Sequence, residues 1–259
     1  CAAMWLAGFS INNLTLMALT IGTGCTEGAP IVESIEVPKC ANTVELEELT
    51  VMVSGSVVDF VTRQPVEGAT VDIGKAWVSG TRFPDNACSL TTTQTGANGR
   101  FGPLAVKAGP DPGLFESRFL VFQGAGVAPV ASDARVGCVG DTCSVFDHVI
   151  PAPSLDLAAD WRIELDDGGM EDARTRGLVA FEFRNSDGFP AAGVTATEEN
   201  LFEMIPLERG DHVRYLEADR TSVASTSVSE TLGSGVALIG VLANLEGTRP
   251  IGGKRGNEF

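Results

Sequence analysis

The chain has 259 residues, of which 44% are hydrophobic and 20% charged, so it can bury an ordinary core and does not have the composition of a disordered chain. Its net charge of −16 argues against a nucleic-acid partner and against docking on anionic lipid, because both need clustered Lys and Arg. Its 30 Gly and 13 Pro lie between short segments rich in Val, Thr and Ala, which indicates an all-β protein with many turns.

The first 24 residues contain no Asp, Glu, Lys or Arg, and their apolar stretch ends at Cys25. We expect residues 1–24 to be a signal peptide or a membrane anchor, with lipidation at Cys25 attaching the protein to a membrane. The small residues before Cys25 suit a signal peptidase, although Gly22 stands where a large aliphatic residue is usual and no basic segment precedes the apolar stretch.

A second interpretation of this segment is open. Residues 8–24, GFSINNLTLMALTIGTG, resemble a transmembrane helix of RND-type multidrug efflux pumps. The acidic pair that follows in that family is missing here, and the resemblance covers a small part of the chain. It therefore implies no transport function, and a fused or misassembled 5′ end is the alternative to a signal or anchor.

Residues 25–48 form an acidic stretch with Pro30 and Pro38, which predicts an extended linker. The next segments carry strand and turn signals. Alternating apolar residues predict a strand at 50–60, a turn follows at 62–68, and a second strand is expected at 69–73. Asn98-Gly99 predicts a tight turn that leads into another strand, and residues 119–122 are expected to be a buried strand.

Three short motifs in this region keep a characteristic order. They are Gly55-Ser56-Val57, then Pro65-Val66-Glu67-Gly68-Ala69-Thr70-Val71, then Thr95-Gly96-Ala97-Asn98-Gly99-Arg100-Phe101. Together they resemble the carboxypeptidase regulatory-like (prealbumin-like) domain over about residues 50–125. The resemblance implies a β-sandwich at residues 49–154, and in the zinc carboxypeptidases this domain is an accessory rather than the catalytic part.

The motifs return in the second half of the chain. An apolar strand is expected at 177–183, and Pro190-Ala191-Ala192-Gly193 and Thr231-Leu232-Gly233-Ser234-Gly235 repeat the earlier units in the same order. We therefore expect two tandem Greek-key prealbumin-like β-sandwiches, the second more diverged and lying at 176–259. Residues 155–175 are expected to link them, with a short helix favoured over a strand by the spacing of Leu157, Ala158, Trp161 and Leu165.

Six cysteines are present, and four remain if Cys1 is removed and Cys25 is lipidated. An even set outside the cytoplasm predicts disulfides, which we expect to be Cys138–Cys143 and Cys40–Cys88, although four cysteines allow three pairings. A metal site made of Cys138, Cys143 and His148 is the rival hypothesis, but no fourth ligand is evident.

No catalytic constellation is evident in the sequence. His148 and His212 each follow an aspartate, but neighbours on a strand point to opposite faces, and neither histidine belongs to an H-x-x-E motif. A G-x-S-x-G elbow and a nucleotide-binding glycine loop are also missing. A calcium site is the alternative interpretation of the acidic side chains near Gly168-Gly169, which are Asp166, Asp167, Glu171 and Asp172.

These observations predict a non-catalytic lipoprotein of the cell envelope, with the outer membrane as its expected site, or a secreted protein. We expect no cofactor, no catalytic residue and no resident metal. The expected partner is an envelope protein or a glycan. A carbohydrate-binding module is one alternative, with Trp77 and Trp161 as its aromatic candidates. Accessory domains of a hydrolase whose catalytic part lies elsewhere are the other.

Overall fold

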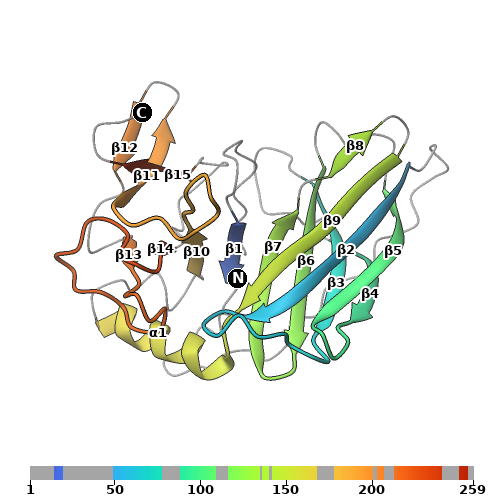
Figure 1. Ribbon diagram of the computed structural model, residues 1–259, viewed down its shortest axis with the longest axis horizontal. Coiled ribbons are helices and arrows are strands. Elements are labelled where there is room, and N and C mark those ends of the chain that lie inside the picture. Colours follow the sequence, from blue (N-terminus) through green and yellow to red (C-terminus); the bar gives the residue numbers. More distant parts are fainter. Residues whose placement is uncertain are drawn as a thin grey trace. The chain divides into compact units, whose positions relative to one another are not determined.

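The computed structural model describes residues 15–19, 49–77, 88–108, 116–134, 136–139, 142–167, 178–200, 203–206, 213–240 and 251–255 (Figure 1). The described residues fall in two compact units. The first unit lies within Glu33–Ser154, and the second lies within Cys1–Val32 and Leu155–Phe259. Strands dominate both units, which confirms the all-β prediction.

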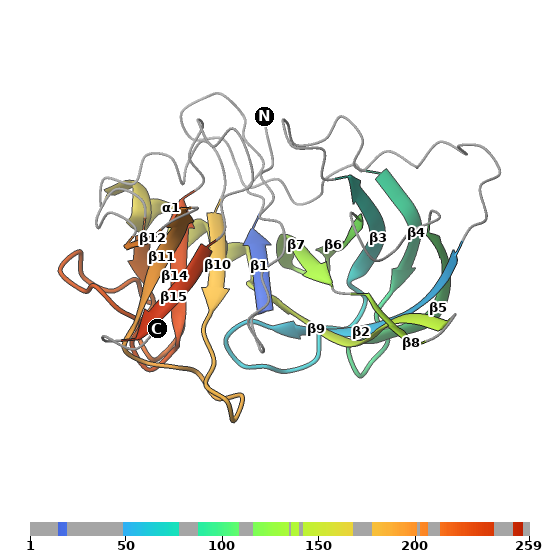
Figure 2. The same cartoon turned by 90° about the horizontal axis from the view of Figure 1, so that it is seen from above.

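The first unit contains two sheets that face each other (Figure 2). One has the order β5-β2-β9-β8 and the other contains β7-β6-β3-β4. The strands are β2 (Leu49–Asp59), β3 (Thr70–Trp77), β4 (Cys88–Gln94), β5 (Arg100–Ala108), β6 (Glu116–Gly124), β7 (Val127–Ala134), β8 (Gly137–Val139) and β9 (Thr142–Ala152). Each predicted strand of this region is present with shifted ends.

The core of the first unit follows from the alternation of β2, in which Val51, Val53 and Val57 are buried. Strand β3 of the facing sheet contributes Val71 and Ile73. β2 pairs antiparallel with β5 but parallel with β9. The chain that leads from β2 to β9 must therefore form a crossover connection. Both pairings shift register between Val53 and Gly55, which is the position of a β-bulge.

The second unit contains α1 (Leu155–Asp167) and seven described strands. The strands are β1 (Thr15–Leu19), β10 (Leu178–Glu182), β11 (Val194–Asn200), β12 (Glu203–Pro206), β13 (Val213–Tyr215), β14 (Val236–Gly240) and β15 (Ile251–Arg255). β13, β14, β10 and β1 form successive antiparallel pairs, and β12-β11-β15 is a separate sheet. Phe181, Phe183, Tyr215 and Ile239 belong to a buried hydrophobic cluster of this unit.

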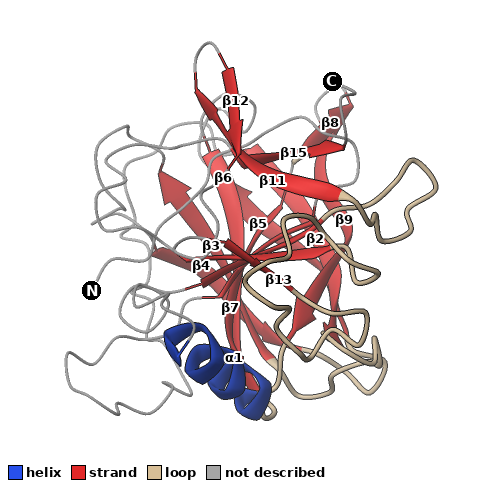
Figure 3. Ribbon diagram, turned by 90° about the vertical axis from the view of Figure 1, so that its left-hand side faces the viewer, coloured by secondary structure: helices blue, strands red, loops and turns tan. Residues whose placement is uncertain are grey.

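A helix was predicted from the spacing of Ala158, Trp161 and Leu165, and α1 is present there (Figure 3). These three side chains are fully buried, while Ile163 between them is 60% exposed, as one apolar stripe on a helix requires. The Trp161 indole Nε1 donates a hydrogen bond to the Thr221 carbonyl at 2.7 Å. α1 is therefore packed into the second unit, of which it is a part.

Within the segment expected to be a signal peptide or anchor, the structure describes Thr15–Leu19 as strand β1, paired antiparallel with β10. The residues around it, including Cys25, lie outside the described part, so lipidation of Cys25 stays a prediction. In the described ranges, the protein has no helix of the length and apolar character that a membrane crossing requires.

Candidate functional site

The P-x-x-G and T-x-x-x-G motifs of the first unit fold into one hydrogen-bonded structure, which we call the clasp. The Thr95 hydroxyl donates to the Val66 carbonyl at 2.7 Å and accepts from the Ala69 amide at 2.9 Å. The backbone adds bonds from the Gly68 amide to the Thr95 carbonyl and from the Thr95 amide to the Ala69 carbonyl. Thr95 is buried, so these bonds replace the water that the same groups would otherwise need.

The second unit contains the same clasp. The Thr231 hydroxyl donates to the Ala191 carbonyl at 2.6 Å and accepts from the Val194 amide at 3.0 Å. The Gly193 amide donates to the Thr231 carbonyl, and the Thr231 amide donates to the Val194 carbonyl. The two motifs that were predicted to be repeated therefore occupy equivalent places in both units.

One glycine in each clasp is held where a side chain cannot fit. Gly99 has φ +70°, and a Cβ built on it would lie 2.6 Å from the Val57 carbonyl oxygen. Gly235 has φ +69°, and its Cβ would lie 2.7 Å from the Phe183 carbonyl oxygen. Each glycine carbonyl accepts a hydrogen bond from the backbone amide of the residue that crowds it, which is Val57 for Gly99 and Phe183 for Gly235. The close carbonyl oxygen and the positive φ together explain why glycine is needed at both positions.

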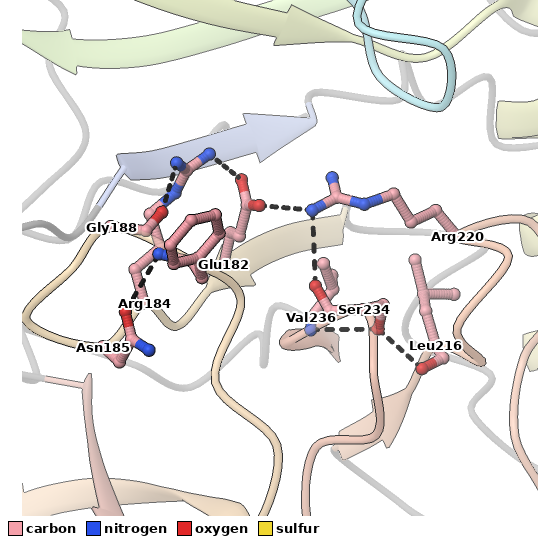
Figure 4. Close-up of polar contacts among 9 residues, drawn as sticks. Glu182, Arg184, Asn185, Gly188, Leu216, Arg220, Ser234 and Val236 are labelled. Atoms are coloured by element: carbon pink, nitrogen blue, oxygen red, sulfur yellow. Dashed lines mark hydrogen bonds and ion pairs between the residues drawn. The ribbon is translucent and has the colours of Figure 1, made fainter.

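The equivalence of Val57 with Phe183 shows where the two units differ. Ser56 of the first unit corresponds to Glu182 of the second. The Glu182 side chain is only 5% exposed and forms ion pairs with Arg184, at 3.0 Å, and with Arg220 (Figure 4). Arg184 also donates to the Gly188 carbonyl.

Burial explains why this ion-pair cluster is structural. A carboxylate out of water must be compensated, and each Glu182 oxygen faces one guanidinium group. The Arg220 side chain is only 12% exposed. Its φ of +64° places its backbone in the left-handed region, which residues other than glycine rarely adopt. The cluster ties β10 to the 184–188 turn and to residue 220, and its carboxylate is engaged rather than available as a general acid or base.

Strand β9 of the first unit carries two exposed apolar side chains on one side of its sheet. Val145 and Ile150 on β9 are buried, whereas Phe146 is 73% exposed and Val149 is 45% exposed. Asp147 lies between them with φ +46°, in the bulge that shifts the register of β9 against β2. The bulge places Phe146 and Val149 on the same side of the sheet, away from the core.

A charged pair accompanies this face. Arg100 on β5 forms an ion pair with Asp147 on β9, so the contact spans the intervening strand β2. Both side chains are more than half exposed, and the pair therefore contributes little to stability. We call Phe146, Val149, Arg100 and Asp147 the outer face of the first unit.

His148 and Asp147 are neighbours on β9, and their side chains contact different residues. The His148 Nε2 atom lies 2.8 Å from the buried Ser132 hydroxyl on β7, while Asp147 contacts Arg100. Burial lowers the pKa of His148 from 6.5 to about 4, because the charged imidazolium would lose its hydration. His148 is therefore neutral at physiological pH and serves the interior of the sandwich.

Cys138 and Cys143 form the predicted disulfide, with their Cα atoms 4.1 Å apart. This pairing rules out the metal site proposed for Cys138, Cys143 and His148, because the sulfur atoms are bonded to each other. Cys40 lies outside the described residues and nothing is described of the Cys88 side chain on β4, so their pairing stays a prediction. In the described part of the chain, three or more metal-ligating side chains do not gather anywhere.

The aromatic candidates for sugar binding have separate outcomes. The suggestion that Trp161 binds sugar at the surface is wrong, because this side chain is fully buried and its indole N–H donates to the Thr221 carbonyl. Trp77 belongs to β3, but its side chain lies outside the described part, as do His212, Glu171, Asp172 and the side chains of Asp166 and Asp167.

Sequence reasoning missed Glu182, Arg220 and Phe146. A signal for Glu182 existed, because Arg184 is two residues further along the chain and alternate strand residues share a face. The exposure of Phe146 was missed because the bulge at Asp147 interrupts the alternation of buried and exposed residues along β9, and no residue type in the sequence marks this bulge.

Comparisons with known proteins add little to this geometry. No family model matches the chain, and no curated protein matches it. Among solved structures, the chain is similar to the dioxygenase domain of a novel dioxygenase carbohydrate-binding protein fusion from the cellulolytic bacterium Streptomyces sp. SirexAA-E. The identity is 19%, with 49% of this chain and 95% of the other covered. The TM-score of 0.28 is too low for this likeness to carry an argument about fold or function.

Proposed function

We propose that this chain is a non-catalytic binding or structural protein of the cell envelope, or a secreted one, built from two tandem Greek-key prealbumin-like β-sandwiches. The observation that carries the proposal is the duplicated clasp, in which Thr95 and Thr231 make equivalent bonds. A motif that folds identically in both halves supports duplication of one module. In this proposal α1 begins the second module.

The engagement of the chemically capable groups supports a non-catalytic role. Glu182 is held by two arginines, and His148 faces Ser132 within the sandwich. A general base must reach a substrate proton, and a neutral imidazole turned into a core does not do so. An enzyme role would be supported instead if the protein hydrolysed members of a substrate panel and the rate dropped when His148 was substituted.

The proposed compartment rests on the Cys138–Cys143 disulfide, because such bonds persist outside the reducing cytoplasm. We propose attachment to the membrane through lipid on Cys25 or through an uncleaved apolar anchor. Mass spectrometry of the mature amino terminus from a membrane fraction tests this, beside a Cys25→Ala variant. A diacyl or triacyl mass on Cys25 that the variant lacks supports the lipoprotein; a free terminus in the medium means secretion, and cytoplasmic retention contradicts both.

The outer face of the first unit is the surface we propose for partner contact. Exposed aromatic and aliphatic side chains beside an accessible charged pair are typical of protein interfaces, in which aromatic and Arg residues are enriched. A photoreactive amino acid placed at Phe146 on intact cells should give a discrete cross-linked product. The matched control is Ile163 on α1, which is also exposed and apolar. Equal products at both positions, or none at 146, would contradict a role for this face.

Carbohydrate binding is the second candidate, and Phe146 is the observation that favours it. An exposed ring can lie against the apolar face of a sugar while Arg100 and Asp147 offer hydrogen bonds at its edge. A glycan array compares the native chain with Phe146→Ala. Signals that vanish in the variant would support this function, and an array with no signal above background for either protein would end it.

A further inference from the structure

The disulfide of the first unit joins the shortest strand of its sheet, β8, to its neighbour β9. β8 has three residues, all exposed, at the end of the order β5-β2-β9-β8. It pairs with β9 through Gly137 opposite Ser144, Cys138 opposite Cys143 and Val139 opposite Thr142. A three-residue edge strand with no buried side chain has little besides this short ladder and the covalent bond to hold it in place.

The two sulfur-bearing residues differ sharply in access. Cys138 is exposed on β8, whereas Cys143 on β9 is only 2% exposed and lies among core residues such as Val145. Thiol–disulfide exchange requires an incoming thiolate to reach one sulfur while the other leaves. Only the Cys138 sulfur belongs to a residue that solvent reaches, so attack is directed to it.

We propose that Cys138–Cys143 is a thiol–disulfide exchange site for a dithiol reductant of the oxidoreductase class. A thiolate of the reductant attacks Cys138 Sγ, the Cys138–Cys143 bond breaks, and Cys143 leaves as a thiolate that takes a proton. The second thiol of the reductant then displaces Cys138 from the mixed disulfide. The reductant is oxidised to its own disulfide by two electrons, and both cysteines become thiols.

Reduction at this site leaves the sandwich folded. The bond closes a loop with a sequence separation of only 5, and so short a loop restricts the unfolded chain much less than a long one does. Cys143 also keeps its place in the parallel ladder with Val51 on the other side of β9. The structural effect is therefore local: β8 separates and the Thr142–Ser144 edge of β9 becomes available for pairing with another strand.

The inference is tested on the full chain with dithiothreitol as the reductant, without denaturant. After alkylation, peptide mass spectrometry reports Cys138 and Cys143 separately from the other four cysteines, and circular dichroism follows the fold. The expected result is alkylation of both residues with an unchanged spectrum, together with faster amide exchange over Gly137–Val139. Alkylation only at denaturant concentrations that unfold the sandwich would overturn the proposal, and so would unchanged amide exchange after reduction.

Two single variants test the direction of attack. Cys143→Ser leaves the exposed Cys138 thiol, and Cys138→Ser leaves the buried Cys143 thiol. Cys138 should react with an aromatic disulfide reagent at least about tenfold faster than Cys143, because access governs the rate. Equal rates at the two thiols would contradict attack at Cys138. The exchange site does not depend on the binding role proposed above, and each can fail without the other.

Discussion

Thr95 and Thr231 make the same pair of side-chain hydrogen bonds in the two units. Each hydroxyl donates to the carbonyl of the residue after a proline and accepts from the amide of the residue after a glycine. In each unit, the buried threonine side chain therefore links its own segment to a turn that is distant in sequence and to the start of the strand after that turn. Its duplication yields predictions that can be made in parallel for both units.

Thr95→Val should destabilise the first unit by about 2 kcal/mol, and Thr231→Val should do the same to the second. Valine keeps the shape but removes the hydroxyl that pairs with a buried amide and with a carbonyl, which is part-buried in the first unit and buried in the second. Urea unfolding followed by probes in each unit measures the effect, and Thr→Ser at either position is the control that keeps the hydroxyl. Similar stability for the valine and serine variants would show that these bonds contribute nothing.

Gly99→Ala should be far more harmful than Gly68→Ala. Both glycines have positive φ, but a Cβ at Gly68 meets nothing within 4 Å, whereas one at Gly99 would lie 2.6 Å from a carbonyl oxygen. The backbone strain alone accounts for about 1 kcal/mol at Gly68, and the clash should add at least about 2 kcal/mol at Gly99. Thermal unfolding of the two variants gives the comparison, and equal losses would mean that the clasp relaxes around the new methyl group.

Glu182→Gln should lower the free energy of unfolding by about 2 kcal/mol, because Arg220, which is 12% exposed, and the partly exposed Arg184 lose their compensating charge. Glu230→Gln, an exposed carboxylate in the same unit, is the matched control and should change stability by less than about 0.5 kcal/mol. Chemical denaturation measures both. A Glu182 variant as stable as the control would mean that water reaches the cluster.

His148 should make the first unit acid-sensitive. The unfolded chain binds a proton near pH 6.5, but burial keeps the folded imidazole neutral down to about pH 4. Protons therefore favour the unfolded state, so the free energy of unfolding falls as the pH drops from 6.5 to 4, by up to about 3 kcal/mol, and is unaffected by this group above 6.5. His148→Gln should flatten that part of the curve in urea unfolding. A native and a variant curve of equal slope would contradict the buried neutral state.

The repeat could be predicted from the sequence because its residues are needed at fixed positions. Pro65, Gly68, Thr95 and Gly99 recur as Pro190, Gly193, Thr231 and Gly235, since turn geometry and close backbone approach admit few alternatives. The helix was also predictable, because Trp161 and Leu165 follow one stripe. Contacts between distant segments were not predictable. The hydrogen bond between Ser132 and His148, for example, depends on how the two sheets stack. Exposure of Phe146 depends on a bulge that no local residue type requires.

The parallel pairing of β2 with β9 determines when the first unit can fold. Val51 lies beside Cys143, so the central ladder of its sheet joins residues 143 − 51 = 92 positions apart. Loop closure over such a distance is slow, and no earlier strand supplies that ladder. A chain that emerges from its amino terminus, from a ribosome or through a translocation channel, therefore cannot complete this sheet until β9 has passed. Premature folding is thereby delayed, at the expense of a longer exposure of unpaired strands to aggregation.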